Sequence, residues 1–401
     1  MTTEELTEDQ KQHCERERRV RRFSDAEMSR RIEELRRQMS AHNLDAMVFT
    51  DEVNVVYATG MLVPSFATRT RPIIVVLPLT GEPILVCSRS QSANARSASA
   101  VATIAPFERF EDDAIDVVTG ILNDVVPRGG RVGCETGKEQ RLGLSIHGFH
   151  ALANSVPERH IVDGSPALWP VRLIKSGEEI AYMKTAGAMN DVAMAEAVAT
   201  TRRGATEQMV RDVWALELAR HGADKPGYLA IHSGPDNYRR ISSVATDRVL
   251  EDGDLLWMDG GPVYRGYWSD VTRMVSVGPA RQADKSRYSF AWETVNTLVD
   301  AVKPGMTAGD IARMSAAIFS RIGRPMGGAS RIGHGIGLEL TEPPSIVDGD
   351  ETVLRPGMTI SIETGLADWD GYFLMETNLV VTESGRDLLS PPAPQSLPEA
   401  L

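Results

Sequence analysis

Residues 258–273 read MDGGPVYRGYWSDVTR, and this stretch decides the fold of the second half of the chain. Asp259 ends the apolar run LLWMD, and Asp270 lies inside the next β-rich run, YWSDVTRMVSV. Burying one unpaired carboxylate in such a run costs on the order of several kcal/mol. Acids at these two positions therefore indicate strands that carry carboxylates into the interior for a chemical purpose.

Three further residues extend this pattern. His334 lies in GHGIGLEL, Glu363 ends the strand-like run MTISIE, and Glu376 lies in GYFLMETNLVV. Carboxylate oxygens with one imidazole suit a divalent transition metal such as Mn, Fe, Co or Zn. Four carboxylates can bridge two such ions about 3.5–4 Å apart. Singly, an Asp in a strand commonly faces solvent and a His beside glycines is commonly packed, so the joint occurrence carries the interpretation.

Length, composition and charge restrict the class of protein. A chain of 401 residues suits two domains, and 42% apolar with 24% charged residues is typical of globular proteins. A net charge of -12 disfavours nucleic acid and anionic membranes as partners. The three cysteines are too few and too scattered for a disulfide framework. With no apolar leader and no run of 18 apolar residues, we expect a cytoplasmic protein without a membrane partner.

The first half alternates strand and helix patterns. Met28, Ile32, Leu35 and Met39 recur at helical spacing, and we expect the arginines around them on a solvated face. LDAMVFTD, PIIVVLP, PILVCS and RVGCE are strand-like, and residues 112–126 are helical by period. We expect residues 1–170 to form a small α/β domain with a charged leading helix.

Near residue 170 the pattern of the sequence changes. Pro170 and the following VRLIK suggest an extended linker, and Ser176 with Glu179 forms a capping box that opens a helix to about Thr200. We therefore expect a second domain over residues 171–401. Its further elements are expected to be helices at 206–221 and 307–322 and strands near 228–233, 254–259, 266–276, 357–363 and 371–382, an α+β pattern.

These motifs resemble a known family. MDGGPVYRGYWSDVTR, GHGIGLELTEPP, LRPGMTISIETG and GYFLMETNLVVTESG look like the pita-bread fold of methionine aminopeptidases, prolidases, aminopeptidase P and creatinase. The segments RLIKSGEEIAYMKTAG and VKPGMTAGDIA also match, and the matches spread over roughly residues 170–387. The first domain is similar, more loosely, to the creatinase-type N-terminal domain.

The resemblance implies a metal site. The family's five metal ligands fall on Asp259, Asp270, His334, Glu363 and Glu376, and all five keep the ligand type. Creatinase itself has lost most of these ligands, so their presence here resembles the metal-dependent members of the family. The resemblance implies two divalent ions (Mn, Co, Fe or Zn) and an activated bridging water.

The sequence also departs from the family's peptidases. Their two substrate histidines fall at about Ser242 and at Thr341, although Glu342 and Pro344 of the second motif remain. His232 either takes over part of this role or is structural. Tyr238, Arg239 and Arg240 either line the same pocket or are exposed loop residues.

One stretch of the first domain implies a dimer. MLVPSFATRTRPIIVV looks like the creatinase stretch in which a Phe and an Arg from one subunit reach the other subunit's active site. Arg71 matches that Arg best, with Phe66 and Arg69 nearby, and an Arg fork suits a substrate carboxylate. A surface Arg at a strand start is the alternative. If the match holds, the protein is a homodimer.

Three hypotheses for function follow. The first is a dinuclear-metal hydrolase of an amide or other C–N bond, with Glu342 or Glu363 carrying the proton and a small carboxylate-bearing substrate such as an Xaa-Pro dipeptide. The second is a non-peptidase member of the same fold, like creatinase, ectoine hydrolase or a lyase of dimethylsulfoniopropionate. The third is a non-catalytic binding protein, which retention of all five ligands disfavours.

Overall fold

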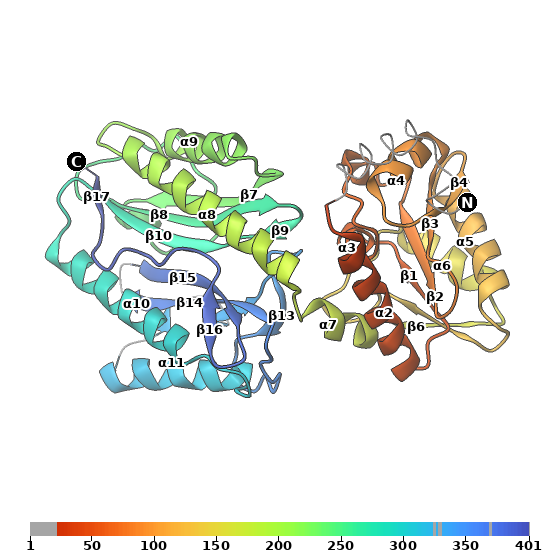
Figure 1. Ribbon diagram of the computed structural model, residues 1–401. Coiled ribbons are helices and arrows are strands. Elements are labelled where there is room, and N and C mark those ends of the chain that lie inside the picture. Colours follow the sequence, from red (N-terminus) through yellow and green to blue (C-terminus); the bar gives the residue numbers. More distant parts are fainter. Residues whose placement is uncertain (1–21, 324–325, 328–330, 369–370, 401) are drawn as a thin grey trace. The chain divides into compact units, whose positions relative to one another are not determined.

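The computed structural model describes residues 22–323, 326–327, 331–368 and 371–400. It divides into two compact units, Met1–Arg172 and Leu173–Leu401 (Figure 1). Cys14 and the charged residues before Arg22 lie outside the described residues. Among the described helices, none combines the length and the apolar character needed to cross a lipid bilayer.

The first unit is built on a six-stranded mixed sheet with the strand order β4-β3-β2-β1-β5-β6. The β1–β2 and β2–β3 pairs are antiparallel, and the β3–β4, β1–β5 and β5–β6 pairs are parallel. Its strands are β1 (Ala46–Phe49), β2 (Ile74–Pro78), β3 (Ile84–Ser88), β4 (Thr103–Phe107), β5 (Arg131–Cys134) and β6 (His160–Asp163). Its α-helices are α2 (Asp25–Ala41), α3 (Glu52–Thr59), α4 (Ser92–Ala98), α5 (Glu111–Val125), α6 (Ile146–Ser155) and α7 (Ser165–Arg172).

Helix α2 confirms the helical stripe, with one correction. The Ser24 hydroxyl accepts a hydrogen bond from the Glu27 amide and caps the helix. The arginines were expected on a solvated face, but Arg31 is fully buried. Its guanidinium lies over the rings of Phe23 and Tyr57 and donates to Glu27. Two aromatic faces and a carboxylate satisfy a charge that the local pattern assigns to solvent.

Residues 165–172 also differ from expectation. Pro170 and its neighbours were expected to be extended, but they lie in helix α7. Ala167, Leu168 and Val171 are buried at helical spacing. Because burial of this apolar stripe stabilises the helix, it outweighs the local preference set by the proline.

The second unit contains two sheets. The first has the order β17-β10-β8-β7 with β9 paired to β8, and the second has the order β13-β12-β14-β15-β16 with β11 paired to β14. The strands are β7 (Lys225–Ser233), β8 (Leu255–Tyr264), β9 (Tyr267–Trp268), β10 (Val271–Val277), β11 (Met326–Gly327), β12 (Gly333–Gly335), β13 (Glu342–Ser345), β14 (Thr359–Asp368), β15 (Gly371–Val381), β16 (Arg386–Leu388) and β17 (Glu399–Ala400). The helices are α8 (Gly177–Thr200), α9 (Glu207–Arg220), α10 (Gln282–Ala301) and α11 (Ala308–Ile322).

Two pairs of helices cover these sheets. Helices α8 and α9 lie over the β7–β8–β10 sheet, and α10 and α11 lie beside β14 and β15 (Figure 1). The capping box of Ser176 and Glu179 is present at the start of α8, which ends at Thr200 as expected. Helix α10 was not predicted. The layers leave long, almost fully buried strands between the helix pairs, which is where buried ligands must lie.

Candidate metal centre

The five expected ligands come from five neighbouring segments of the second unit. Asp259 lies on β8, Asp270 directly precedes β10, His334 is the middle residue of β12, and Glu363 and Glu376 lie on β14 and β15. All except the half-buried Glu363 are at most 9% exposed. The antiparallel register of β14 and β15 places Glu363 directly opposite Glu376. Long-range strand pairing therefore gathers residues that are far apart in the sequence.

Three of these residues form a group able to hold an ion. One ligand atom from each of Asp270, His334 and Glu376 lies within 4.8 Å of the others. His334 Nε2 is 3.9 Å from Asp270 Oδ2 and 3.9 Å from Glu376 Oε1. These separations are too long for hydrogen bonds and leave room for a cation between the three atoms.

One hydroxyl group joins Asp259 to this group, and a second holds Glu376. Thr272 Oγ1 lies 2.7 Å from Asp259 Oδ1 and 3.2 Å from Glu376 Oε2. Ser361 donates a hydrogen bond to Glu376 Oε1. These bonds fix the directions of the carboxylates, as outer-shell partners of metal ligands do.

The tautomer of His334 follows from its surroundings. Its Nδ1 is 2.9 Å from the carbonyl oxygen of Gly335. A carbonyl only accepts, so the proton is on Nδ1 and the lone pair of Nε2 faces Asp270 and Glu376. Burial lowers the pKa of His334 to about 4, which keeps the imidazole neutral at pH 7. A neutral imidazole with its lone pair turned toward carboxylates is the form that binds metals.

The acids are destabilised in their charged form. Burial, and then the charge of Asp259, raises the pKa of Glu363 to about 7. Burial likewise raises the pKa values of Asp259, Asp270 and Glu376, with the neighbouring acids adding to the last two. Among the described residues, Asp270 Oδ1 has no hydrogen-bond partner although it is buried. An unpartnered oxygen, a neutral imidazole and four crowded acids are the donor set that a divalent cation fits.

Sequence reasoning missed the residues that support the ligands. Asn378 Oδ1 accepts a hydrogen bond from the Asp270 amide at 2.8 Å. Thr272, Ser361 and Asn378 each lie two positions from Asp270, Glu363 and Glu376, respectively. Since alternate residues of a strand share a face, this spacing was the available signal. Arg331, also missed, opposes the effect of burial on the pKa values of Asp270 and Glu363.

Glu342, expected as a proton carrier, lies outside this group. Its Oε2 is 2.7 Å from Lys175 Nζ, and the two side chains are only 1% and 2% exposed. Its Oε1 accepts a weak hydrogen bond from the Glu339 amide. This buried ion pair anchors the turn from β12 to β13.

The other expected substrate residues differ in placement. Tyr238 is buried against Phe373 and accepts a hydrogen bond from the Leu255 amide at 2.7 Å. Thr341 and Arg240 are exposed. His232 is buried and stacks on Trp257. Of these residues, Tyr238 makes the contacts of a core side chain.

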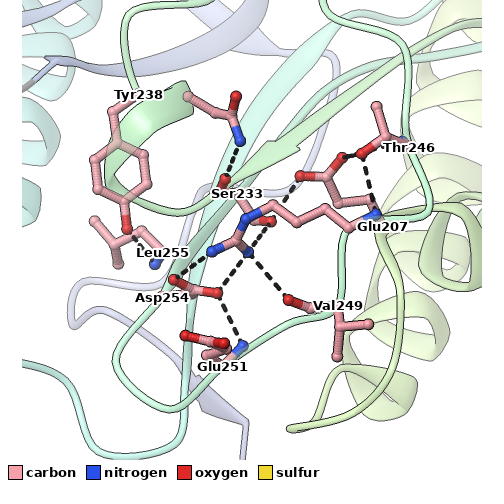
Figure 2. Close-up of polar contacts among 10 residues, drawn as sticks. Glu207, Ser233, Tyr238, Thr246, Val249, Glu251, Asp254 and Leu255 are labelled. Atoms are coloured by element: carbon pink, nitrogen blue, oxygen red, sulfur yellow. Dashed lines mark hydrogen bonds and ion pairs between the residues drawn. The ribbon is translucent and has the colours of Figure 1, made fainter.

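The loop from β7 to β8 is held by a charged network (Figure 2). Arg248 donates to both oxygens of Asp254, at 2.6 and 3.1 Å, and to Ser233 Oγ at 2.9 Å. Glu207 accepts from Ser233 and from the hydroxyl of Thr246, each at 2.7 Å. The network fixes both ends of the loop that contains Ser242.

Phe66 and Arg71 lie in the first unit. They line a cavity of about 1340 Å³ within that unit. The Arg71 guanidinium lies 5.8 Å from the centre of the Phe110 ring, and Arg69 also lines the cavity. Neither Arg69 nor Arg71 has an acidic partner among the described residues.

Comparisons with known proteins add to this geometry. Residues 181–383 match the model of metallopeptidase family M24, and residues 31–174 match the creatinase/prolidase N-terminal domain. The Xaa-Pro dipeptidase of Pyrococcus furiosus is 33% identical over 221 residues, which is 55% of this chain and 64% of that protein. The aligned stretch thus spans less than two thirds of that relative.

Other relatives match over nearly their whole length. The probable dipeptidase PepE of Mycobacterium tuberculosis is 28% identical over 382 residues, covering 91% of this chain and 95% of that protein. The crystal structure of dipeptidase PepE from Mycobacterium ulcerans is similar with a TM-score of 0.80 at 27% identity, covering 94% of this chain and 99% of that chain.

Proposed function

The chain belongs to metallopeptidase family M24, and from that premise we propose that it is a metal-dependent hydrolase. Its reaction is cleavage of an amide or other C–N bond in a small, carboxylate-bearing substrate, as in Xaa-Pro dipeptidases. The carrying observation is the buried group of Asp270, His334 and Glu376, whose ligand atoms lie within 4.8 Å of one another. The relatives named as dipeptidases support this choice.

Two divalent ions are the proposed cofactor, with manganese as the first candidate and Co, Fe or Zn as the others. Asp259, Asp270, His334, Glu363 and Glu376 would hold them. When bound, such ions supply Lewis-acid activation of a carbonyl and of water at neutral pH.

The chain's own residues orient the site and move the proton. Thr272 and Ser361 hold the carboxylates of Asp259 and Glu376 in fixed directions, and Asn378 holds the backbone amide of Asp270. Glu363 is the least buried of the four acids, which supports it as the group that passes a proton to the leaving nitrogen. The pairing of Glu342 with Lys175 disfavours Glu342 for this step.

Substrate recognition is proposed to involve both units. Arg71 and Phe66 are proposed to meet a substrate carboxylate in a homodimer, and the absence of an acidic partner for Arg71 in the described part of the chain supports this. Arg240 and Thr341 are exposed and are proposed as rim contacts. The contacts of Tyr238 leave its hydroxyl little freedom to bind substrate. We place the enzyme in the cytoplasm.

One observation favours a second candidate. Ser242 and Thr341 stand where the peptidases of the resemblance carry histidines. The two missing histidines favour a non-peptidase member of the fold, such as a creatinase- or ectoine-hydrolase-like enzyme or a lyase.

The test is turnover of a substrate panel by manganese- or cobalt-loaded protein. The panel holds Gly-Pro, Ala-Pro, an Xaa-Pro tripeptide, creatine, ectoine and dimethylsulfoniopropionate, with Asp270→Ala as the inactive control. Metal-dependent cleavage of a prolyl peptide supports the first candidate. If protein that binds metal cleaves none of the peptides, the first candidate is refuted. Incorporation of ¹⁸O from labelled water then separates a hydrolase from a lyase.

A further inference from the structure

The strand beside the metal centre presents a row of three side chains. In the β7–β8 pair, Ala230 lies opposite Asp259, and Tyr228 and His232 lie two residues to either side of Ala230. Alternate residues of a strand point to one face, and opposite residues of an antiparallel pair share that face. Tyr228 and His232 therefore flank the small Ala230 on the face that carries Asp259.

This register brings His232 within reach of the centre. His232 pairs with Trp257, so Asp259 is its diagonal neighbour. Diagonal neighbours in an antiparallel pair have Cβ atoms about 7–8 Å apart or somewhat less. Side chains at that separation are within reach of each other, so one small molecule bound beside Asp259 can also contact the His232 ring.

The imidazole is held in place but not satisfied. His232 is 3% exposed, and its ring stacks on Trp257 with centroids 4.6 Å apart at 25°. Within the described part of the chain, neither ring nitrogen has a hydrogen-bond partner, and Nδ1 is fully buried. Buried polar atoms are normally paired, so an unpaired nitrogen near a metal centre indicates a partner that binds there.

Burial and one nearby positive charge keep the His232 ring neutral. Burial, and then the positive charge of Arg240, lowers the pKa of His232 to about 4. At neutral pH the ring offers one donor and one acceptor and carries no charge. Such a group suits an uncharged amide better than a carboxylate or an ammonium group.

We propose that His232 binds the amide group of the substrate next to the bond that is cleaved. It does so from the sheet, in a protein whose loop positions Ser242 and Thr341 are not histidines. This inference rests on the proposed function and names the residue that recognises the amide. Tyr228, on the other side of Ala230 in the same strand, bounds the other side of the same space.

The kinetic test compares His232→Ala and His232→Gln with wild type, using the best amide substrate of the panel. We expect His232→Ala to lower kcat/KM by about 100-fold, with the bound metal per chain unchanged. Because glutamine also offers a donor and an acceptor, His232→Gln should recover at least tenfold of the loss. The matched control is His221→Ala, an exposed histidine at the end of α9. A value for His232→Ala within threefold of wild type overturns the proposal.

A second measurement tests the proposal even if His232→Ala fails to fold or the wild type cleaves no amide. Zinc-loaded protein with ¹⁵N-labelled histidine rings is titrated with acetohydroxamate, a small amide-like chelator, until the His334 signals stop moving. We expect the His232 signals, identified by their loss in His232→Gln, to shift in the same titration. Unmoved His232 signals overturn the proposal. Shifted His232 signals without amide turnover refute the proposed reaction and leave His232 as a ligand contact.

Discussion

At the scale of single residues, the site is governed by charges that are buried together. Asp270 and Glu376 are each at most 6% exposed and lie near a neutral His334 that cannot balance them. In the metal-free protein, repulsion and lost hydration both oppose folding. A bound cation reverses the sign of these terms. The same residues therefore destabilise the apo form and stabilise the loaded form.

Asp270→Asn should have opposite effects in the two forms. In metal-free protein we expect a higher melting temperature than wild type, because one buried charge is removed. In the presence of manganese we expect a lower melting temperature than wild type and less bound metal. Thermal unfolding with and without a chelator, combined with metal analysis, measures both. A variant that is less stable than wild type in both forms would contradict the electrostatic account.

Glu363 gives a pH dependence with a definite sign. Its pKa is raised from 4.5 to about 7, so the folded metal-free protein binds more protons than the unfolded chain between these values. Its contribution to stability therefore falls as pH rises from about 4.5 to about 7. We expect Glu363→Gln to remove this fall, so that the variant gains stability over wild type between pH 5 and pH 8. Urea unfolding of both metal-free proteins at several pH values measures the difference.

His334 works against Glu363 in the same pH range. Burial lowers the pKa of His334 from 6.5 to about 4, so the unfolded chain binds more protons between these values. Its contribution to stability rises with pH, which makes the difference between wild type and variant the informative quantity. An equal pH slope in wild type and Glu363→Gln would refute the raised pKa.

At the scale of elements, side-chain contacts hold the turn from β12 to β13. Trp268 donates from its amide to the Gly337 carbonyl at 2.9 Å and from its indole to the Leu338 carbonyl at 3.1 Å. A Cβ at Gly337 would lie 2.7 Å from the Glu342 carboxylate. The turn is therefore wrapped around Glu342, and Lys175 balances the charge. This ion pair lies directly beneath the backbone that follows β12.

Lys175→Met should be strongly destabilising. It leaves the Glu342 carboxylate buried and unpaired, which costs about 3–5 kcal/mol. The double variant Lys175→Met, Glu342→Leu should recover much of that loss. The matched control is Lys184→Met, since the Lys184–Asp387 pair is exposed and is worth about 1 kcal/mol or less. Chemical denaturation of wild type and the three variants measures these free energies of unfolding. Equal losses of stability for Lys175→Met and Lys184→Met would contradict the prediction.

At the scale of the whole molecule, two units have separate cores. Val48, Val76 and Val132 lie in the core of the first unit, whereas Ile360 and Met375 lie in a core of the second. All five expected ligands belong to the second unit. Family membership and structural similarity confirm a creatinase-type α/β domain followed by a pita-bread domain. Metal binding should therefore act on one unit.

Removal of metal should loosen the second unit selectively. Hydrogen exchange measures this unit by unit: we expect chelation to speed amide exchange in β14 and β15, which carry two ligands, because a ligand bound only to the native state adds to its stability. Exchange in β1 and β2 should change little. An equal acceleration in both pairs of strands would show that the units unfold together.

The sequence determined the α+β class, the two-domain order and the strand positions of Asp259, Glu363 and Glu376, whereas Asp270, expected inside a strand, directly precedes β10. Apolar runs, a capping box and short motifs are local signals, and residues such as Ser176 and Asp259 express them within a few positions. The assignment of the ligands to two ions stays a prediction.

The tertiary structure alone decided the rest. It buried Arg31 between two rings, made helix α7 from an expected linker, paired Lys175 with Glu342, and placed Ala230 opposite Asp259. Each of these contacts, except the helix, joins residues far apart in the sequence. Strand register and burial set such contacts, and both depend on the packing of the whole unit rather than on the local pattern.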